Sequence, residues 1–236
     1  GQDNEQPLVI AMCHGGPTGA TSSALNLKIQ YWTNRGFAVV DINYRGSTGF
    51  GRTYRQALAG AWGIADVEDT QSAIRYLAEQ QKIDPERCLI RGGSAGGYTV
   101  LSALTFTDTF KAGASLYGIG DLETLATDTH KFESRYLDSL IGPYPERRDI
   151  YRERSPIHHA EGLNCPVIFL QGLEDKVVPP NQAEMMVELL TEKGIKVDYV
   201  TFPDEGHGFR KANNIIRAME SELSFYQDVF NLAGKA

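Results

Sequence analysis

The sequence predicts an α/β fold in which a mainly parallel sheet is flanked by helices. Short apolar runs with β-strand character alternate with longer segments whose apolar residues recur at helical spacing. Several runs are almost continuously apolar, as is typical of strands covered on both faces by crossover helices. With 236 residues, of which 42% are hydrophobic and 22% charged, the chain can bury a sizeable core. We therefore expect residues 1–236 to form a single domain.

The apolar runs predict six strands and the segments between them predict the main helices. The strands are expected at residues 7–13, 37–42, 88–90, 111–116, 166–170 and 196–202. The helices are expected at residues 25–35, 66–81, 98–106, 181–193 and 213–230. Gly36 stops the first helix, and Asp66 can cap the second.

Two stretches interrupt this alternation. Residues 44–65 are rich in glycine and aromatic residues, and residues 117–163 are too long for an ordinary connection. We expect each to carry a surface insertion or lid with its own short helices, and to determine substrate selectivity. The mixed charges of residues 146–154 are typical of a solvated helix face.

Charge and cysteine content limit the partners and the location. The chain has 23 Lys and Arg against 30 Asp and Glu, a formal net charge of −7, which disfavours binding to nucleic acid. No apolar run is long enough to span a bilayer, so we expect no membrane contact. Cys13, Cys88 and Cys165 cannot all pair with one another and lie in apolar strand-like runs. We therefore expect the thiols to be reduced and buried, and the protein to be cytoplasmic.

The strongest functional signal is a glycine-rich turn that follows the third predicted strand. It reads Gly92-Gly93-Ser94-Ala95-Gly96-Gly97 and leads into the helix predicted at 98–106, which fits a G-x-S-x-G nucleophile elbow. Side chains at the glycine positions would clash with the strand and helix packed on either side. The pattern therefore predicts that Ser94 is a nucleophile presented on a sharp turn.

A serine nucleophile requires a base and an orienting acid, and the chain supplies both in later loops. Asp175 lies just beyond the strand at 166–170, and His207 lies just beyond the strand at 196–202. Loops at the carboxyl ends of parallel strands converge on one edge of a sheet, and the order Ser, Asp, His is that of α/β-hydrolases. We expect His207 to accept the Ser94 proton while Asp175 fixes its tautomer.

An acyl-transfer site also needs backbone donors for the developing oxyanion. One is expected from the N–H of Ala95, the residue after the nucleophile. The other is expected from the loop after the first strand, which reads His14-Gly15-Gly16-Pro17. We assign it to Gly16 rather than Gly15.

Each of these residues also has a structural interpretation. A glycine-rich turn can hold phosphate, but no Gly-Lys-Ser/Thr ending is present. Taken one at a time, the three residues also have structural interpretations: Ser94 as a turn residue, Asp175 as a helix cap and His207 as a loop histidine. All three, however, follow sheet strands in the order that a triad requires. The adjacent His158 and His159 are interpreted as structural, and without H-E-x-x-H or paired cysteines we expect neither a metal nor another cofactor.

Five motifs together resemble the catalytic domain of the prolyl oligopeptidase family of serine peptidases, in its acylaminoacyl-peptidase and dipeptidyl-peptidase branch. They are His14-Gly15-Gly16-Pro17, Asn43-Tyr44-Arg45-Gly46-Ser47, Gly92 to Gly97, Gln171-Gly172 with Asp175 to Pro179, and Gly206-His207-Gly208. The resemblance implies an α/β-hydrolase fold, a triad of Ser94, Asp175 and His207, and short or blocked peptides as substrates. Where prolyl oligopeptidase has an arginine after the catalytic aspartate, this chain has Lys176. Lys176 and Tyr117 are further candidates for substrate binding.

The resemblance also implies that the chain is the C-terminal part of a longer protein. Family members have an upstream propeller domain, and their sheet begins with further strands before the His-Gly-Gly-Pro strand. This chain, by contrast, starts almost at that strand. We therefore expect a sheet that lacks the first strands of the full fold, and we allow for a homo-oligomer. The leading hypothesis is a serine peptidase that acts on short or N-blocked oligopeptides through an acyl-enzyme. The alternatives are a carboxylesterase, since the same triad hydrolyses esters, and an inactive isolated fragment.

Overall fold

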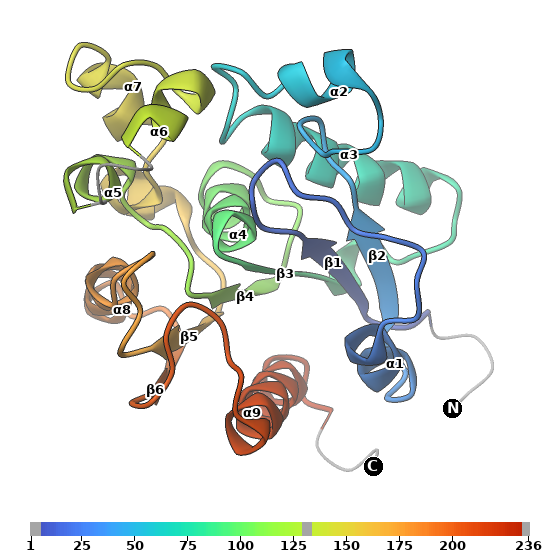
Figure 1. Ribbon diagram of the computed structural model, residues 1–236. Coiled ribbons are helices and arrows are strands. Elements are labelled where there is room, and N and C mark those ends of the chain that lie inside the picture. The colour runs from blue at the N-terminus through green and yellow to red at the C-terminus, as the bar shows by residue number, and fades with distance from the viewer. Residues whose placement is uncertain (1–5, 129–133, 233–236) are drawn as a thin grey trace.

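The computed structural model describes residues 6–128 and 134–232 and shows a six-stranded, fully parallel sheet with helices on both faces (Figure 1). The strands are β1 (Val9–Cys13), β2 (Ala38–Ile42), β3 (Cys88–Gly93), β4 (Ala112–Leu116), β5 (Val167–Gly172) and β6 (Val197–Phe202). Their order across the sheet is β2-β1-β3-β4-β5-β6. All six strands predicted from the sequence are confirmed.

The main helices are also confirmed, with ends that shift by a few residues. They are α1 (Leu27–Thr33), α3 (Ala65–Glu79), α4 (Ala95–Phe106), α8 (Asn181–Glu192) and α9 (Ala212–Val229). Short 3₁₀ segments, η1 (Pro85–Arg87) and η2 (Pro156–Gly162), precede β3 and β5. Figure 1 shows α1 and α9 together on one face of the sheet and α3, α4 and α8 on the other.

Two apolar cores follow from the alternation of side chains along the strands. In β1, Val9 and Ala11 pack with residues of α3, α4 and α8, whereas Ile10 and Met12 pack with residues of α1 and α9. Every residue of β1 is buried, as expected of a central parallel strand covered on both faces. The two cores hold the carboxyl ends of the strands, and the loops that leave them, in fixed positions.

The two long stretches contain short helices of their own, as predicted. The first carries α2 (Arg52–Gln56), and the second carries α5 (Leu122–Asp128), α6 (Ser134–Leu140) and α7 (Arg148–Glu153). In the second stretch, Glu123 accepts hydrogen bonds from the guanidinium groups of Arg148 and Arg152, which join α5 to α7. Backbone bonds from Gly60 to Ser139 and from Trp62 to Leu140 connect the two stretches.

The expectation that Asp66 caps α3 is wrong by two positions. Ile64 is the N-cap residue, and Asp66 lies inside the first turn, where the helix dipole favours a carboxylate. From there its side chain reaches back to the N–H of Gly63 and across to the hydroxyl of Thr99 on α4.

The cysteines are free thiols, with Cys13 and Cys88 buried and Cys165 half-buried. Burial raises the pKa of Cys13 to about 12 and those of Cys88 and Cys165 to about 11, so all three remain protonated at neutral pH. Within residues 6–128 and 134–232 no helix is long and apolar enough to cross a membrane. The same residues contain no group of three or more His, Cys, Asp or Glu side chains placed to hold a metal ion.

Candidate active site

Ser94 occupies a strained turn between β3 and α4. Its φ of 57° and ψ of −122° lie in a region that residues with a side chain rarely adopt. A Cβ added to Gly96 would lie 2.2 Å from the carbonyl oxygen of Cys13, and one added to Gly92 would lie 2.4 Å from that of Gly96. The glycines predicted around the nucleophile are thus required by the close approach of α4 to β1 and β3.

The structure brings Ser94, His207 and Asp175 into one hydrogen-bonded chain. Nε2 of His207 lies 2.9 Å from Oγ of Ser94, and Nδ1 lies 2.8 Å from Oδ2 of Asp175. The three residues follow β3, β6 and β5, respectively, so three loops at the carboxyl edge of the sheet supply them. Asp175 is buried and His207 is half-buried.

Hydrogen bonds to Asp175 determine which nitrogen of His207 carries the proton. Oδ1 of Asp175 accepts the backbone N–H groups of Val177 and Val178, both at 2.9 Å. The side-chain amide of Gln171 braces the same turn by donating to the carbonyl of Val178. An ionised carboxylate can only accept, so His207 donates from Nδ1 and leaves Nε2 free to accept the Ser94 proton.

The loop that carries His207 is fixed to the start of α9 by the buried carboxylate of Glu205. This carboxylate accepts the side-chain amide of Asn214 and the backbone N–H groups of Lys211 and Arg210. These hydrogen bonds lower the pKa of Glu205. The sequence analysis did not single out Glu205, although it lies two residues before His207.

A small cavity of about 90 Å³ adjoins Ser94. Gly16 and Ala95, the residues predicted to donate to an oxyanion, both line it. Gly15 also lies close, because a Cβ on it would be 3.5 Å from the Cβ of Ser94. The remaining lining residues are Pro17, Trp62, Ile119, Leu125, Tyr136, Leu137, Leu140, Val177 and Val178.

Among the residues that the structure describes, the wall of this cavity carries no charged side chain, and it comes largely from the two long stretches. Trp62 belongs to the first stretch, and Tyr136, Leu137 and Leu140 of α6 belong to the second. The sequence analysis predicted that these stretches determine selectivity, but it named none of these residues. An apolar side chain that faces a cavity has the same sequence pattern as one that faces a core.

The loop that contains Gly15 and Gly16 is held by His14. Its ring stacks on Tyr44 with centroids 4.3 Å apart, and its Nε2 lies 2.6 Å from Oγ of Ser47. Its Nδ1 lies 2.8 Å from the carbonyl oxygen of Gly15. Burial lowers the pKa of His14, and its Nδ1 donates to the Gly15 carbonyl oxygen, which can only accept.

Comparison with known proteins identifies the family. The sequence profile described as the prolyl oligopeptidase family matches residues 23–233. The chain belongs to the prolyl oligopeptidase family. Its fold is the α/β-hydrolase fold of the catalytic domain in this family, as the sequence predicted.

Similar members of the family are named as peptidases. The chain is 35% identical over 218 residues to dipeptidyl aminopeptidase BIII of Pseudoxanthomonas mexicana, covering 90% of this chain and 32% of that protein. It is 31% identical over 210 residues to an acylamino-acid-releasing enzyme of Arabidopsis thaliana, covering 84% and 27%. A solved puromycin-hydrolyzing peptidase of Mycobacterium tuberculosis superimposes with a TM-score of 0.94 at 50% identity, covering 96% and 35%. The chain thus spans about a third of the length of these relatives.

Tyr117 and Lys176 were the two further candidates for substrate binding, and neither lines the cavity beside Ser94. The Tyr117 ring packs edge-on against His207, with centroids 5.0 Å apart, and against Phe209, with centroids 5.4 Å apart. Burial raises the pKa of Tyr117, which keeps its phenol neutral. Lys176 is exposed, next to the buried Asp175.

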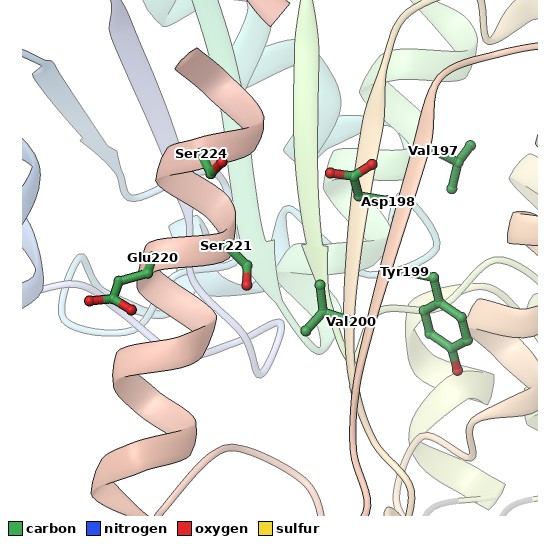
Figure 2. Close-up of a pocket in the computed structure, with 7 residues that line it drawn as sticks. All are labelled: Val197, Asp198, Tyr199, Val200, Glu220, Ser221 and Ser224. Atoms are coloured by element: carbon green, nitrogen blue, oxygen red, sulfur yellow. The ribbon is translucent and has the colours of Figure 1, made fainter. Parts of the chain in front are cut away.

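A hollow larger than this cavity lies elsewhere, between β6 and α9 (Figure 2). Its volume is about 570 Å³, and Asp198 and Glu220 give it an acidic lining. It contains none of the residues predicted to act in catalysis or binding. The larger of these two hollows is therefore not the one that adjoins Ser94.

Replacing Gly172 with alanine is expected to lower kcat/KM about a hundredfold, the typical cost of displacing a reacting group by about 1 Å. The new Cβ would lie 2.4 Å from the carbonyl oxygen of Gly206 and 2.5 Å from that of Glu205, so the loop carrying His207 must move. The measurement is steady-state kinetics, with circular dichroism to verify folding. Gly206→Ala is the matched control, because its Cβ would meet only the Glu174 carbonyl, at 3.7 Å. Equal rates for both variants would contradict this account of the loop.

Proposed function

We propose that the chain is the catalytic unit of a serine peptidase that hydrolyses short or N-blocked peptides through an acyl-enzyme. The observation that carries the proposal is the hydrogen-bonded chain from Ser94 through His207 to Asp175, ending at an apolar cavity. Family membership and the names of the relatives support the same class of reaction.

In the acylation step, Oγ of Ser94 attacks the substrate carbonyl carbon while Nε2 of His207 takes the hydroxyl proton. The tetrahedral oxyanion accepts hydrogen bonds from the backbone N–H groups of Gly16 and Ala95. When the C–N bond breaks, the imidazolium returns its proton to the departing amine, and Ser94 keeps the acyl group as an ester. Asp175 stays ionised and stabilises the imidazolium.

Water then attacks the ester by the same route. His207 takes a proton from the water, a second tetrahedral oxyanion forms in the same place, and its collapse returns the proton to Ser94 and releases the acid. The products are a free amine and a free carboxylic acid, and the enzyme is restored without a cofactor.

The cavity favours an apolar side chain next to the scissile bond. The described residues of its wall are apolar apart from the hydroxyls of Tyr136 and Ser94, the indole N–H of Trp62 and the backbone. A charged side chain would lose its hydration there without gaining an ion pair with any of them. The relatives are named for dipeptidyl, acylamino-acid and puromycin substrates, and we extend short or blocked substrates to this chain on that basis.

The test uses a matched pair of blocked aminoacyl substrates, one anilide and one ester, with the same apolar side chain. We expect the chain to cleave both, and Ser94→Ala to cleave neither. Turnover of the ester alone would favour the carboxylesterase alternative. Turnover of neither, in a sample with a native circular dichroism spectrum, would favour the inactive-fragment alternative.

A further inference from the structure

A carboxylate outside the triad lies fully buried behind the cavity wall. Asp66, in the first turn of α3, is 0% exposed. Its Oδ1 accepts the backbone N–H of Gly63 at 2.7 Å, and its Oδ2 accepts the hydroxyl of Thr99 at 2.5 Å. Both carboxylate oxygens therefore bind groups on other segments.

One of these two partners, Gly63, is the sequence neighbour of a residue in the cavity wall. Gly63 follows Trp62, which is 2% exposed and lines the cavity beside Ser94. The backbone N–H of Trp62 donates to Leu140 of α6, another residue of the same wall. The position of Gly63 thus affects both the indole and its contact with α6.

The other partner belongs to the helix that starts at the nucleophile. Thr99 lies one turn into α4, and its hydroxyl is also 3.2 Å from the carbonyl oxygen of Ala95. Ser94 is the N-cap residue of this helix. A single carboxylate therefore connects the Trp62 wall to the helix that carries Ser94 and Ala95.

The groups that face Asp66 do not neutralise its charge. They are Cys13 of β1, Tyr44 after β2 and Tyr98 of α4, and burial raises the pKa of each, so all three are neutral. On the far side of the wall, the Arg154 guanidinium donates to the carbonyl oxygen of Trp62. The structure gives Asp66 no ion pair with a described residue. A buried carboxylate without a cation is costly, and a neutral residue would serve folding alone better.

We propose that Asp66 is a positioning residue that determines side-chain selectivity, because it holds the Trp62 wall of the cavity at a fixed distance from α4. This inference rests on the proposed function. The ionised carboxylate makes two charge-assisted hydrogen bonds, which are stronger than neutral ones. They keep the cavity in one shape, which favours a large apolar side chain over a small one.

Protonation of Asp66 weakens this connection. A neutral carboxyl donates to Thr99, whose hydroxyl then turns to the Ala95 carbonyl, and the bond from Gly63 loses its charge assistance. Burial raises the pKa of Asp66 to about 6. The ionised form, and the selectivity that depends on it, are present above this pH and are lost as the pH falls through it.

The test measures a ratio of two kcat/KM values, that of a blocked phenylalanine anilide divided by that of the matched alanine anilide. Both substrates use the same triad, so any effect of pH on the catalytic step itself changes both values equally and cancels. Between roughly pH 8 and pH 5 we expect the wild-type ratio to fall about fivefold, the difference between a charge-assisted and a neutral hydrogen bond. In Asp66→Asn the ratio is expected to be low and constant with pH.

Two further variants separate positioning from folding. Asp69→Asn is the matched control, since Asp69 lies on the same helix and binds Arg45 at the surface; the wild-type ratio and its pH dependence should persist. Thr99→Val removes one of the two bonds without altering the charge, and it should lower the ratio even if Asp66→Asn folds poorly.

The outcomes distinguish this inference from the proposed function. If the wild-type chain cleaves neither anilide, the proposed function fails and the inference fails with it. If both anilides are cleaved and the ratio is the same in wild type, Asp66→Asn and Thr99→Val, the proposed function stands and the role of Asp66 is refuted. A ratio that changes equally in Asp69→Asn would also refute it.

Discussion

Ser94→Ala is expected to lower kcat for a blocked peptide anilide about a millionfold, the scale of loss when a serine nucleophile is removed from a triad. The substitution deletes the atom that lies 2.9 Å from Nε2 of His207 and that would form the acyl-enzyme. KM should change little, because the other residues that line the cavity are unaltered. The measurement is steady-state kinetics together with covalent labelling by a fluorophosphonate, which should modify the wild-type chain and leave Ser94→Ala unlabelled.

The control for this variant is another serine on the same helix. Ser102 is buried on α4, and Ser102→Ala should retain both labelling and turnover. If Ser94→Ala were labelled, or retained more than a small fraction of the wild-type rate, a nucleophile other than Ser94 would have to be sought.

Much of the fold and the three residues of the hydrogen-bonded chain were predictable because their signals are local. Each apolar run marks a strand, and the glycines around Ser94 mark a turn too tight for side chains. Asp175 and His207 follow strands that pair in the sheet, so parallel topology alone brings their loops to one edge. The hydrogen-bonded geometry at His207 agrees with that expectation.

The residues around the hydrogen-bonded chain of Ser94, His207 and Asp175 were not predictable, because their roles depend on contacts between distant segments. Trp62 and Leu140 are far apart in sequence and meet only where the two long stretches fold against each other. Asp66 has the pattern of a helix cap, and only the position of Thr99 on α4 shows that it connects two elements. Tyr117 was named as a candidate for substrate binding, and only the structure shows that its ring packs against His207.

Asp175→Asn is expected to lower kcat about ten-thousand-fold while the chain remains folded, as for comparable triads. The backbone N–H groups of Val177 and Val178 require an acceptor at Oδ1, so the asparagine oxygen must occupy that position. Its amide nitrogen then faces Nδ1 of His207, which can only accept from it. The ring proton moves to Nε2, opposite Ser94, and the imidazole can no longer take the serine proton.

Asp175→Ala separates this tautomer effect from a structural one. Alanine leaves the N–H groups of Val177 and Val178 without their acceptor, and a buried, unpaired donor such as that of Val178 costs about 1–3 kcal/mol. Both variants should be inactive, but only Asp175→Ala should show a markedly lower melting temperature. Asp204→Asn, which alters an exposed partner of Lys211, should change neither property. If Asp175→Asn kept most of the wild-type activity, His207 would not need the Asp175 charge to hold its tautomer. The main role of the Asp175 side chain would then be to accept the hydrogen bonds from Val177 and Val178.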